Sequence, residues 1–481
     1  MVFQNNLLMG AGGQPTGYEI DQSCRFNSAD SAYTGAASPT PTSERIFTFS
    51  FWFKRAKLGT RMNIWSNERD DGATTLGEIE FQADDTIRWK SESAAGANIF
   101  DRQTNAVFRD PAAWYHIVCV CDSNQTDATS AAIYVNGVVQ TYSATTNPGS
   151  AQDLGWPSTG QPFEVGKFVS SAYYLDGYLA HFYFIDGQKL TPSYFGETNS
   201  TTGQWVPKAY TGTFGNAGLF LDFSVAPGTG DGAGTDSSGN DNDLTDSGLA
   251  AGDQVTDSPT DNFCTFNSIA LGSVGGNDKF AALSNGNLVA TASGSDYNWI
   301  YGTIKPASGK WYWEITLTTD NGANWVGVAE DLRVAGSDGD DAGFGMVNGF
   351  GYRDSNGNKI NNSGTSSSYG DTYTAGDVIG VAMDLDNGKI WFSKNGTYQA
   401  SGDPAGGTNA AFTTLSGSYA PAAQESSANA VLTANFGQSS FATAAPTGFS
   451  ALSTANLPDP TIADPSAYFQ PTIYTGDGES S

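Results

Sequence analysis

Apolar and polar residues alternate along many short stretches of this chain, which is the pattern of β-strands with one buried face. The clearest stretch is 378–396, with the sequence VIGVAMDLDNGKIWFSKNG. The apolar residues that share one face of its first half are Ile379, Val381, Met383 and Leu385. Asn387-Gly388 then interrupts the alternation, and such a pair is typical of tight hairpin turns because both residues tolerate a positive φ. The stretch therefore predicts two antiparallel strands joined by a turn.

The first half of the chain shows the same alternation in a more aromatic form. In 46–54 (IFTFSFWFK) every odd-numbered position is Phe, and 114–121 (WYHIVCVC) is apolar on both faces, as in a strand inside a sandwich. Residues 177–190 add a further long strand, whereas the 3.6-residue periodicity of helices is nearly absent. These patterns predict an all-β chain that forms two tandem antiparallel β-sandwiches.

The length of the chain, 481 residues, exceeds one ordinary hydrophobic core and indicates two or three domains. Composition shifts along the sequence mark where they are expected to meet. The expected parts are an N-terminal arm at 1–17, a first sandwich at 18–225, a linker rich in Gly, Asp and Ser at 226–262, a second sandwich at 263–445 and a Pro-punctuated tail at 446–481.

Both sandwiches carry segments that point to known families. In the first, these are FTFSFWFKR at 47–55, Trp114-Tyr115-His116 with Tyr134-Val135-Asn136-Gly137, and the strand from Gly177 to Thr191. They resemble a laminin-G or concanavalin-like jelly roll. In the second, the segments at 309–317, 325–329, 349–352 and 378–396 resemble a SPRY domain. The SPRY resemblance implies recognition and not catalysis, so we predict a binding protein and not an enzyme.

The order of motifs along the whole chain carries a further resemblance. FQNNLLMGA at 3–11, QWVPK at 204–208, DSPTDNF at 257–263 and the string from Tyr468 to Gly478 occur in the order found in large virion proteins of marine tailed bacteriophages. In those proteins the last string leads into further β-rich sequence, which leaves open whether the chain continues beyond residue 481. The resemblance implies a virion structural protein that is made in the host cytoplasm and displayed on the particle surface.

Within that class, the resemblance favours a tail fibre or similar appendage that binds host-surface glycan or another receptor. A capsid decoration or head-fibre protein is the alternative. The expected partners are other virion proteins and the host receptor. A homo-oligomer is also expected, because weak adhesive sites become strong when many copies bind together. Coiled-coil heptads are not found in the sequence, so the copies would meet through the sandwiches, the ends of the chain or other proteins.

Charge and cysteine content narrow the choice of partners. Fifty acidic and 22 basic residues give a net charge of −28, which repels phosphate backbones and makes nucleic acid an improbable partner. No run of 18 apolar residues occurs, so no membrane span is expected. The four cysteines have no metal-finger spacing, and we expect them to be buried thiols. They are Cys24, Cys119, Cys121 and Cys264.

Catalysis has few candidate residues, and we predict no catalytic site. His116 and His181 are the two histidines, and both stand in the middle of aromatic strands, where a structural role is the usual one. A polysaccharide depolymerase is the enzymatic alternative, because some jelly rolls cleave sugars with two carboxylates. Glu78 and Glu80, on one face of a strand, are the candidates for that role. The third acid of laminarinase-type enzymes is replaced by Ala83.

Sugar binding needs exposed aromatic rings beside planar polar groups. The expected ligand-binding residues in loops are Trp156, Tyr173, Tyr174, Trp299, Tyr301 and Tyr352. Calcium binds clustered carboxylate oxygens, and the segments 338–341 (DGDD) and 236–243 are rich in Asp. Neither segment has the spacing of a known calcium loop. We therefore predict no cofactor and no metal ligands, and leave calcium open.

Overall fold

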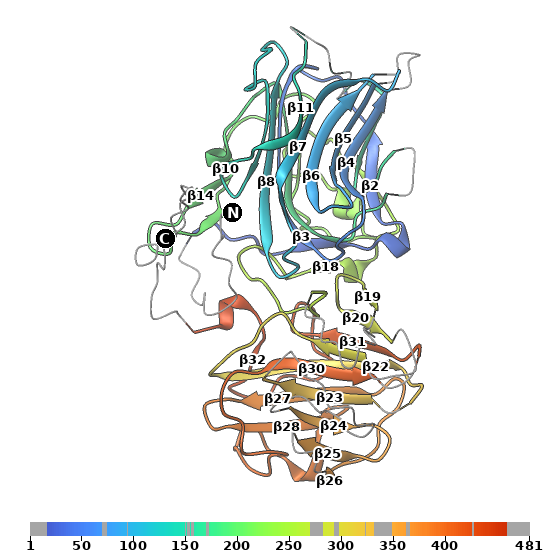
Figure 1. Cartoon of the computed structure of the whole chain (residues 1–481), viewed down its shortest axis with the longest axis vertical. Helices are drawn as coiled ribbons and strands as arrows, with labels where there is room; N and C mark the ends of the chain where they lie inside the picture. The colour runs from blue at the N-terminus through green and yellow to red at the C-terminus, as the bar shows by residue number, and fades with distance from the viewer. Residues whose placement is uncertain are drawn as a thin grey trace, which may run out of the picture.

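A computed structural model of the chain contains two β-sandwiches, which lie one beyond the other along its long axis (Figure 1). In that view the strands of the first sandwich run along the axis and those of the second run across it. The residues that the structure describes are 17–69, 75–93, 95–149, 151, 154, 158–169, 173–269, 282–292, 298–322, 324–330, 349–361, 366–425 and 428–458. Among them, the helices are short 3-10 turns, so the prediction of an all-β chain with two antiparallel sandwiches is confirmed.

The first sandwich is made of two sheets with mainly antiparallel neighbours. The order of the first sheet is β10-β9-β8-β3-β13-β1-β18, with β16 also paired to β13. Its strands are β1 (Ser23–Phe26), β3 (Ile46–Arg55), β8 (Trp114–Asp122), β9 (Ala131–Val135), β10 (Val138–Val139), β13 (Gly177–Asp186), β16 (Leu219–Leu221) and β18 (Gln254–Val255).

The second sheet of this sandwich has the order β11-β7-β6-β5-β4-β12-β2-β17. Its strands are β2 (Tyr33–Ala37), β4 (Met62–Arg69), β5 (Thr75–Phe81), β6 (Thr86–Glu92), β7 (Asn98–Val107), β11 (Tyr142–Thr146), β12 (Pro162–Val165) and β17 (Thr245–Ser247). A separate hairpin contains β14 (Gly196–Thr198) and β15 (Trp205–Pro207) and follows the 3-10 turn η2 (Pro192–Tyr194).

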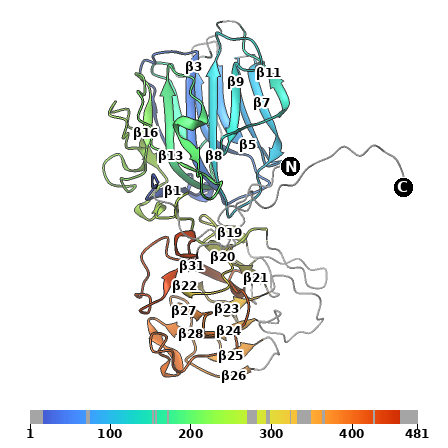
Figure 2. The same ribbon diagram turned by 90° about the vertical axis from the view of Figure 1, so that its left-hand side faces the viewer.

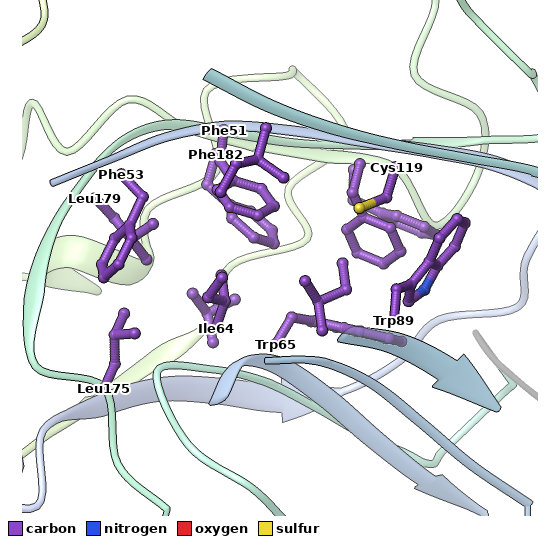
Figure 3. Packing of buried hydrophobic residues seen from close by; sticks show 14 of the residues in the cluster. Phe51, Phe53, Ile64, Trp65, Trp89, Cys119, Leu175, Leu179 and Phe182 are labelled. Atoms are coloured by element: carbon purple, nitrogen blue, oxygen red, sulfur yellow. The ribbon is translucent and has the colours of Figure 1, made fainter. Parts of the chain in front are cut away.

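Aromatic side chains fill the space between these two sheets (Figure 3). The four odd-numbered Phe residues of β3, from Phe47 to Phe53, are fully buried, as the alternation predicted. The ring of Phe49 lies 4.5 Å from that of Trp65 on β4, and the ring of Phe51 stacks at 5.6 Å on Phe182 of β13. Each buried Phe side chain contributes about 1.5–3 kcal/mol through removal from water, so this core holds the two sheets together.

The second sandwich also pairs two sheets. One has the order β19-β20-β31-β22-β27-β28-β29, with β32 beside β22, and the other has the order β21-β30-β23-β24-β25-β26. The strands of the first are β19 (Ala282–Ser284), β20 (Val289–Thr291), β22 (Lys310–Thr319), β27 (Val378–Asp384), β28 (Lys389–Lys394), β29 (Thr397–Tyr398), β31 (Val431–Asn435) and β32 (Ser450–Ala451). Those of the second are β21 (Asn298–Tyr301), β23 (Asn324–Ala329), β24 (Phe350–Arg353), β25 (Asn358–Asn361), β26 (Ser366–Ser368) and β30 (Ala420–Glu425).

The hairpin predicted from 378–396 is present as β27 and β28, which pair from Ile379↔Lys394 to Asp384↔Lys389. Gly388 in its turn has φ +65°, the left-handed conformation that an Asn-Gly turn supplies. Ile379, Val381 and Met383 are fully buried on the inner face of β27. The alternation therefore located both the strands and the face that is buried.

Two of the expected boundaries differ from the arrangement of strands. Residues 226–262, expected as a linker, contain β17 and β18, which pair with β2 and β1 and complete the first sandwich. Within the expected tail, β32 pairs with β22, whereas residues 459–481 lie outside the described residues. These strands are two or three residues long, so their sequence carries no alternation, and pairing with distant strands defines them. Of the expected N-terminal arm, Gly17 is the residue that the structure describes.

The junction between the sandwiches is the segment 257–263 (DSPTDNF), which packs against β3 and β8. Lys54 of β3 donates through Nζ to the Asp257 carboxylate at 2.7 Å, to the Asn262 side-chain oxygen at 2.7 Å and to the Phe263 carbonyl at 2.9 Å. Trp114 of β8 donates its indole N–H to Asp257 at 3.2 Å. Lys54 and Asp257 are both fully buried, so this segment is fixed to the first sandwich.

Further hydrogen bonds join the sandwiches directly. The Tyr178 hydroxyl donates to the Gly286 carbonyl at 2.6 Å, and the Asn287 side-chain amide donates to the Ala56 carbonyl at 3.0 Å. The junction also holds the segments at both ends of the described chain. Ile20 N–H donates to Thr260 Oγ1 at 3.1 Å, and Ala455 N–H, in the 3-10 turn η6 (Thr454–Asn456), donates to the Asp261 carboxylate at 3.1 Å.

None of the helices among the described residues has the length and apolar character needed to cross a membrane.

Candidate functional site

A polar and aromatic patch covers part of the outer face of the second sheet in the first sandwich. The connection from β12 to β13 crosses this face and is held on β4. Ser66 Oγ donates to the Lys167 carbonyl and accepts from Val169 N–H, both at 2.9 Å, and Asn63 N–H donates to the Tyr173 carbonyl at 3.1 Å. These bonds place Phe168 and Tyr173 above the ends of β4 and β5.

Arg61, one residue before β4, joins the aromatic and acidic parts of this patch. Its guanidinium carbon lies 4.3 Å from the ring centre of Tyr173 and 5.5 Å from that of Phe168. Its Nη2 donates to Glu78 at 3.0 Å, and its Nε donates to Glu80. Arg61 is therefore held by two carboxylates and flanked by aromatic rings, which fixes its orientation, while 29% of its side chain stays exposed.

Glu78 and Glu80 point to the same face of β5, as the sequence predicted, because Ile79 and Phe81 fill the core on the opposite face. Both glutamates are fully buried. Glu78 accepts from the Asn63 amide at 3.0 Å and pairs with Lys90 at 2.9 Å. Burial raises the pKa of Glu80 to about 7, and the negative charge of Glu78 adds to the rise while Arg61 opposes it.

This arrangement gives the two carboxylates a structural role. Sugar cleavage requires that one carboxylic acid reach the glycosidic oxygen and the other reach the sugar or a water on the opposite side. Glu78 and Glu80 instead face Arg61, Lys90, Asn63 and Gln82, and solvent reaches neither side chain. The pair therefore positions Arg61 and is closed to a polysaccharide in this conformation.

A pair of tyrosines, Tyr33 and Tyr174, extends the patch to β2. The ring centre of Tyr33 lies 6.4 Å from that of Tyr174. The Lys167 ammonium lies 3.8 Å from the ring centre of Tyr33 and pairs with Glu164 of β12 at 3.1 Å. The name Tyr173 patch is used below for Arg61, Phe168, Tyr173, Tyr174, Tyr33 and Lys167 together.

The aromatic residues that the sequence predicted as ligand-binding occupy different places in the structure. Tyr173 is 39% exposed and Tyr174 is half-buried, and both belong to the patch. Tyr301 and Tyr352, expected in loops, instead lie in β21 and β24 with buried side chains, because these short strands pair with β30 and β25. They cannot present a ring to a ligand. Trp156 and the side chain of Trp299 lie outside the described residues.

Sequence reasoning missed Arg61, Phe168, Lys167 and Tyr33. Glu78 and Glu80 were the available signal, since two buried carboxylates on one strand face need cationic partners. The partner could not be named, however, because the register between β4 and β5 shifts between Asn63 and Trp65. The bulge at this point decides which residue of β4 faces each glutamate.

His116 is part of a buried hydrogen-bond chain that rules out a serine–histidine nucleophile. Trp205 donates its indole N–H to His116 Nδ1 at 2.9 Å, and His116 Nε2 lies 2.8 Å from Ser50 Oγ. An indole N–H can only donate, so Nδ1 carries no proton and the neutral ring carries its proton on Nε2. His116 therefore donates to Ser50 and cannot accept its proton. Burial also lowers the pKa of His116 to about 3.

The Asp-rich segments offer no metal cluster where they are described. Asp236 accepts hydrogen bonds from the backbone N–H groups of Phe220 in β16 and of Ser238 and Asn242 in its own loop, so backbone groups satisfy its carboxylate. Among the described residues, no group of three His, Cys, Asp or Glu side chains is placed to hold a metal ion. Residues 338–341 lie outside the described residues.

A groove of about 600 Å³ lies beside the junction of the two sandwiches. Residues that line it include Tyr18, Glu19, Asp21, Glu197, Asn199 and Asp261. No Lys or Arg is found among its described lining residues, so its charge disfavours anionic ligands.

Comparison with protein families assigns both sandwiches. Residues 27–194 match a laminin G model described as the concanavalin A-like lectin/glucanases superfamily, and residues 310–439 match the SPRY domain model. The chain thus contains a laminin-G-like, lectin-like jelly roll followed by a SPRY domain, as the sequence segments predicted.

Curated relatives are similar over part of the chain. Ran-binding protein 10 of Danio rerio is 28% identical over 141 residues, which cover 29% of this chain and 21% of that protein. Ran-binding protein 9 of Homo sapiens is 29% identical over 141 residues, which cover 29% of this chain and 17% of that protein. The chain spans about a fifth of the length of these relatives.

Among solved structures, the chain is similar to the SPRY domain of human HERC1, with 19% identity and a TM-score of 0.26, over 32% of this chain and 91% of that one. It is also similar to the heptameric SAP-like pentraxin of Limulus polyphemus, with 16% identity and a TM-score of 0.27, over 36% of this chain and 80% of that one.

Proposed function

We propose that this chain, a laminin-G-like jelly roll followed by a SPRY domain, is a structural protein on the surface of a tailed bacteriophage particle. It is made in the host cytoplasm and serves as a tail fibre or similar appendage that binds a glycan on the host surface. The order of the sequence motifs supports the phage assignment. The lectin-like family match of the first sandwich supports glycan binding.

The observation that carries glycan binding is the exposed ring of Tyr173 beside the fixed guanidinium of Arg61. The C–H face of a sugar ring packs on an exposed aromatic ring, and a guanidinium donates to sugar hydroxyl or carboxyl oxygens. Because Glu78 and Glu80 hold Arg61 in place, little side-chain freedom is lost when a ligand binds.

Affinity at such a site is expected to be weak for one copy. An open patch buries less of a ligand than a deep cleft, and adhesion then depends on several copies that act together. We therefore expect partners of two kinds, other virion proteins that collect the copies and the host glycan that they bind.

A glycan array with the full chain tests this function. The variant Tyr173→Ala is expected to lose about two- to tenfold in binding to any glycan that the wild type binds, since stacking on one ring is worth about 0.5–1.5 kcal/mol. Tyr173→Phe keeps the ring and is expected to retain binding. Tyr194→Ala is the matched control, because Tyr194 is a 50% exposed tyrosine in η2, away from the patch. Equal binding by Tyr173→Ala and wild type would contradict the assignment.

Two further measurements test the class of protein. Immunogold labelling of intact particles is expected to mark tail appendages, and label distributed over the head would support the capsid decoration or head-fibre alternative instead. A reducing-end assay on the bound polysaccharide is expected to show no cleavage. Cleavage that disappears in Glu78→Gln with Glu80→Gln would assign the depolymerase alternative.

A further inference from the structure

In the part of the chain that the structure describes, residues 138–146 form one edge of both sheets of the first sandwich. β10 ends the order of one sheet and β11 ends the order of the other. Backbone hydrogen bonds continue between β10 and β11. Gln140 N–H donates to the Ile133 carbonyl, and Asn105 N–H donates to the Thr141 carbonyl, both at 2.9 Å. Figure 2 shows β11 and β7 at the outer side of the sandwich. We call residues 138–146 the edge wall.

Apolar side chains are exposed at one corner of the edge wall. Val138 is 50% exposed and Val139 is 56% exposed. Val107, at the end of β7, is 45% exposed. Val107 belongs to β7, the strand that pairs with β11, whereas Val138 and Val139 form β10 at the edge of the other sheet. Three of the exposed large apolar residues of the described chain thus belong to the edge wall or to the strand that pairs with it.

The edge wall also lacks the features that keep strand edges apart. Exposed edges are usually protected by charged residues or Pro, which prevent pairing with another chain. Residues 128–152 contain no Asp, Glu, Lys or Arg, and neither β10 nor β11 contains Pro. A bulge at Ser143 bends β11, but Ala144 to Thr146 pair in regular register with β7.

We infer that the edge wall is the surface through which two copies of this chain associate. Each copy carries a net charge of −28, so two copies repel each other wherever acidic surfaces meet. A contact made through an uncharged stretch removes that repulsion from the interface. Contact of the exposed corner at Val138 and Val139 with its own copy, about a two-fold axis beside Val139, uses the same residues on both copies, and two-fold symmetry is the commonest among homo-oligomers. The inference goes beyond the proposed function and does not depend on it.

Sedimentation velocity on the full chain tests this inference. The wild type is expected to form a dimer whose fraction rises with concentration up to about 100 µM. Val139→Asp places like charges at the two-fold contact and is expected to weaken association at least about tenfold. Thr245→Asp is the matched control, since Thr245 is an exposed residue of β17 at the opposite edge of the second sheet. It is expected to associate as the wild type does.

A charge-swap experiment then identifies the contact. Val139→Asp and Val139→Lys are each expected to be monomeric alone, and an equimolar mixture is expected to associate again because opposite charges meet at the axis. A wild type that remains monomeric across this range would overturn the inference, as would an association that Val139→Asp leaves unchanged.

Discussion

The junction between the sandwiches depends on one lysine, and its removal has a predictable cost. In Lys54→Met the side chain keeps its length and loses the ammonium, so Asp257, Asn262 and the Phe263 carbonyl all lose a donor. Both members of the ion pair are fully buried. Removal of one partner from such a pair costs about 3–5 kcal/mol, because the remaining charge stays in a medium that cannot solvate it.

Differential scanning calorimetry of the full chain measures this cost. For a domain of this size we expect the melting temperature of the first sandwich to fall by about 10 °C. Lys208→Met is the control, because Lys208 and Glu197 form a largely exposed pair at 3.8 Å, which is worth less than about 1 kcal/mol. A decrease in Lys54→Met that is no larger than in this control would refute the role of Lys54.

A second substitution tests the physical reason for the loss. Asp257→Asn added to Lys54→Met removes the uncompensated charge and keeps the acceptor for Trp114 and Phe263 N–H. The double variant is therefore expected to be more stable than Lys54→Met alone. If the two losses simply add, the cost comes from altered packing and not from the buried charge.

Three further predictions concern other buried polar groups. Burial raises the pKa of Glu425 to about 9, so the folded state keeps a proton that the unfolded state releases above its ordinary pKa near 4.5. The free energy of unfolding therefore falls by up to about 1.4 kcal/mol per pH unit as pH rises between these two values. Glu425→Gln is expected to abolish that slope, measured by urea titrations at about pH 5 and about pH 8. Arg61→Met is expected to lower the free energy of unfolding by about 3–5 kcal/mol in thermal unfolding, because Glu78 and Glu80 would then share Lys90. Adding Glu80→Gln removes one of the two charges and is expected to recover part of this loss. Trp205→Phe is expected to cost about 1–3 kcal/mol and to change the ¹⁵N shift of His116 Nδ1, whereas an unchanged shift would contradict the assigned tautomer.

The strands were predictable where their pattern is local. Phe47 to Phe53 and Ile379 to Met383 alternate over several residues, so the buried face follows from the sequence alone. Tyr301 and Tyr352 lie in strands of four residues, NWIY and FGYR, which are too short to show alternation. Their burial is decided by pairing with β30 and β25, so the expectation that they lie in loops was wrong.

The candidate site was predictable only in part, for a similar reason. Tyr173 and the shared face of Glu78 and Glu80 follow from turn signals and strand periodicity. That these residues belong to one patch depends on Arg61, which reaches all three from the position just before β4. The DSPTDNF segment was identified as a motif, but its packing depends on Lys54, 203 residues before Asp257. Contacts of that separation leave no periodic trace in the sequence.

The attachment of both ends of the described chain to one segment determines how the molecule would respond to force. Ile20 is hydrogen-bonded to Thr260, and Ala455 is hydrogen-bonded to Asp261. A force that pulls residues 17 and 458 apart is therefore transmitted through residues 260–261. Tension would load these few hydrogen bonds first and leave the two cores mechanically shielded. Under tension the molecule would therefore yield first at the junction, before either sandwich unfolds.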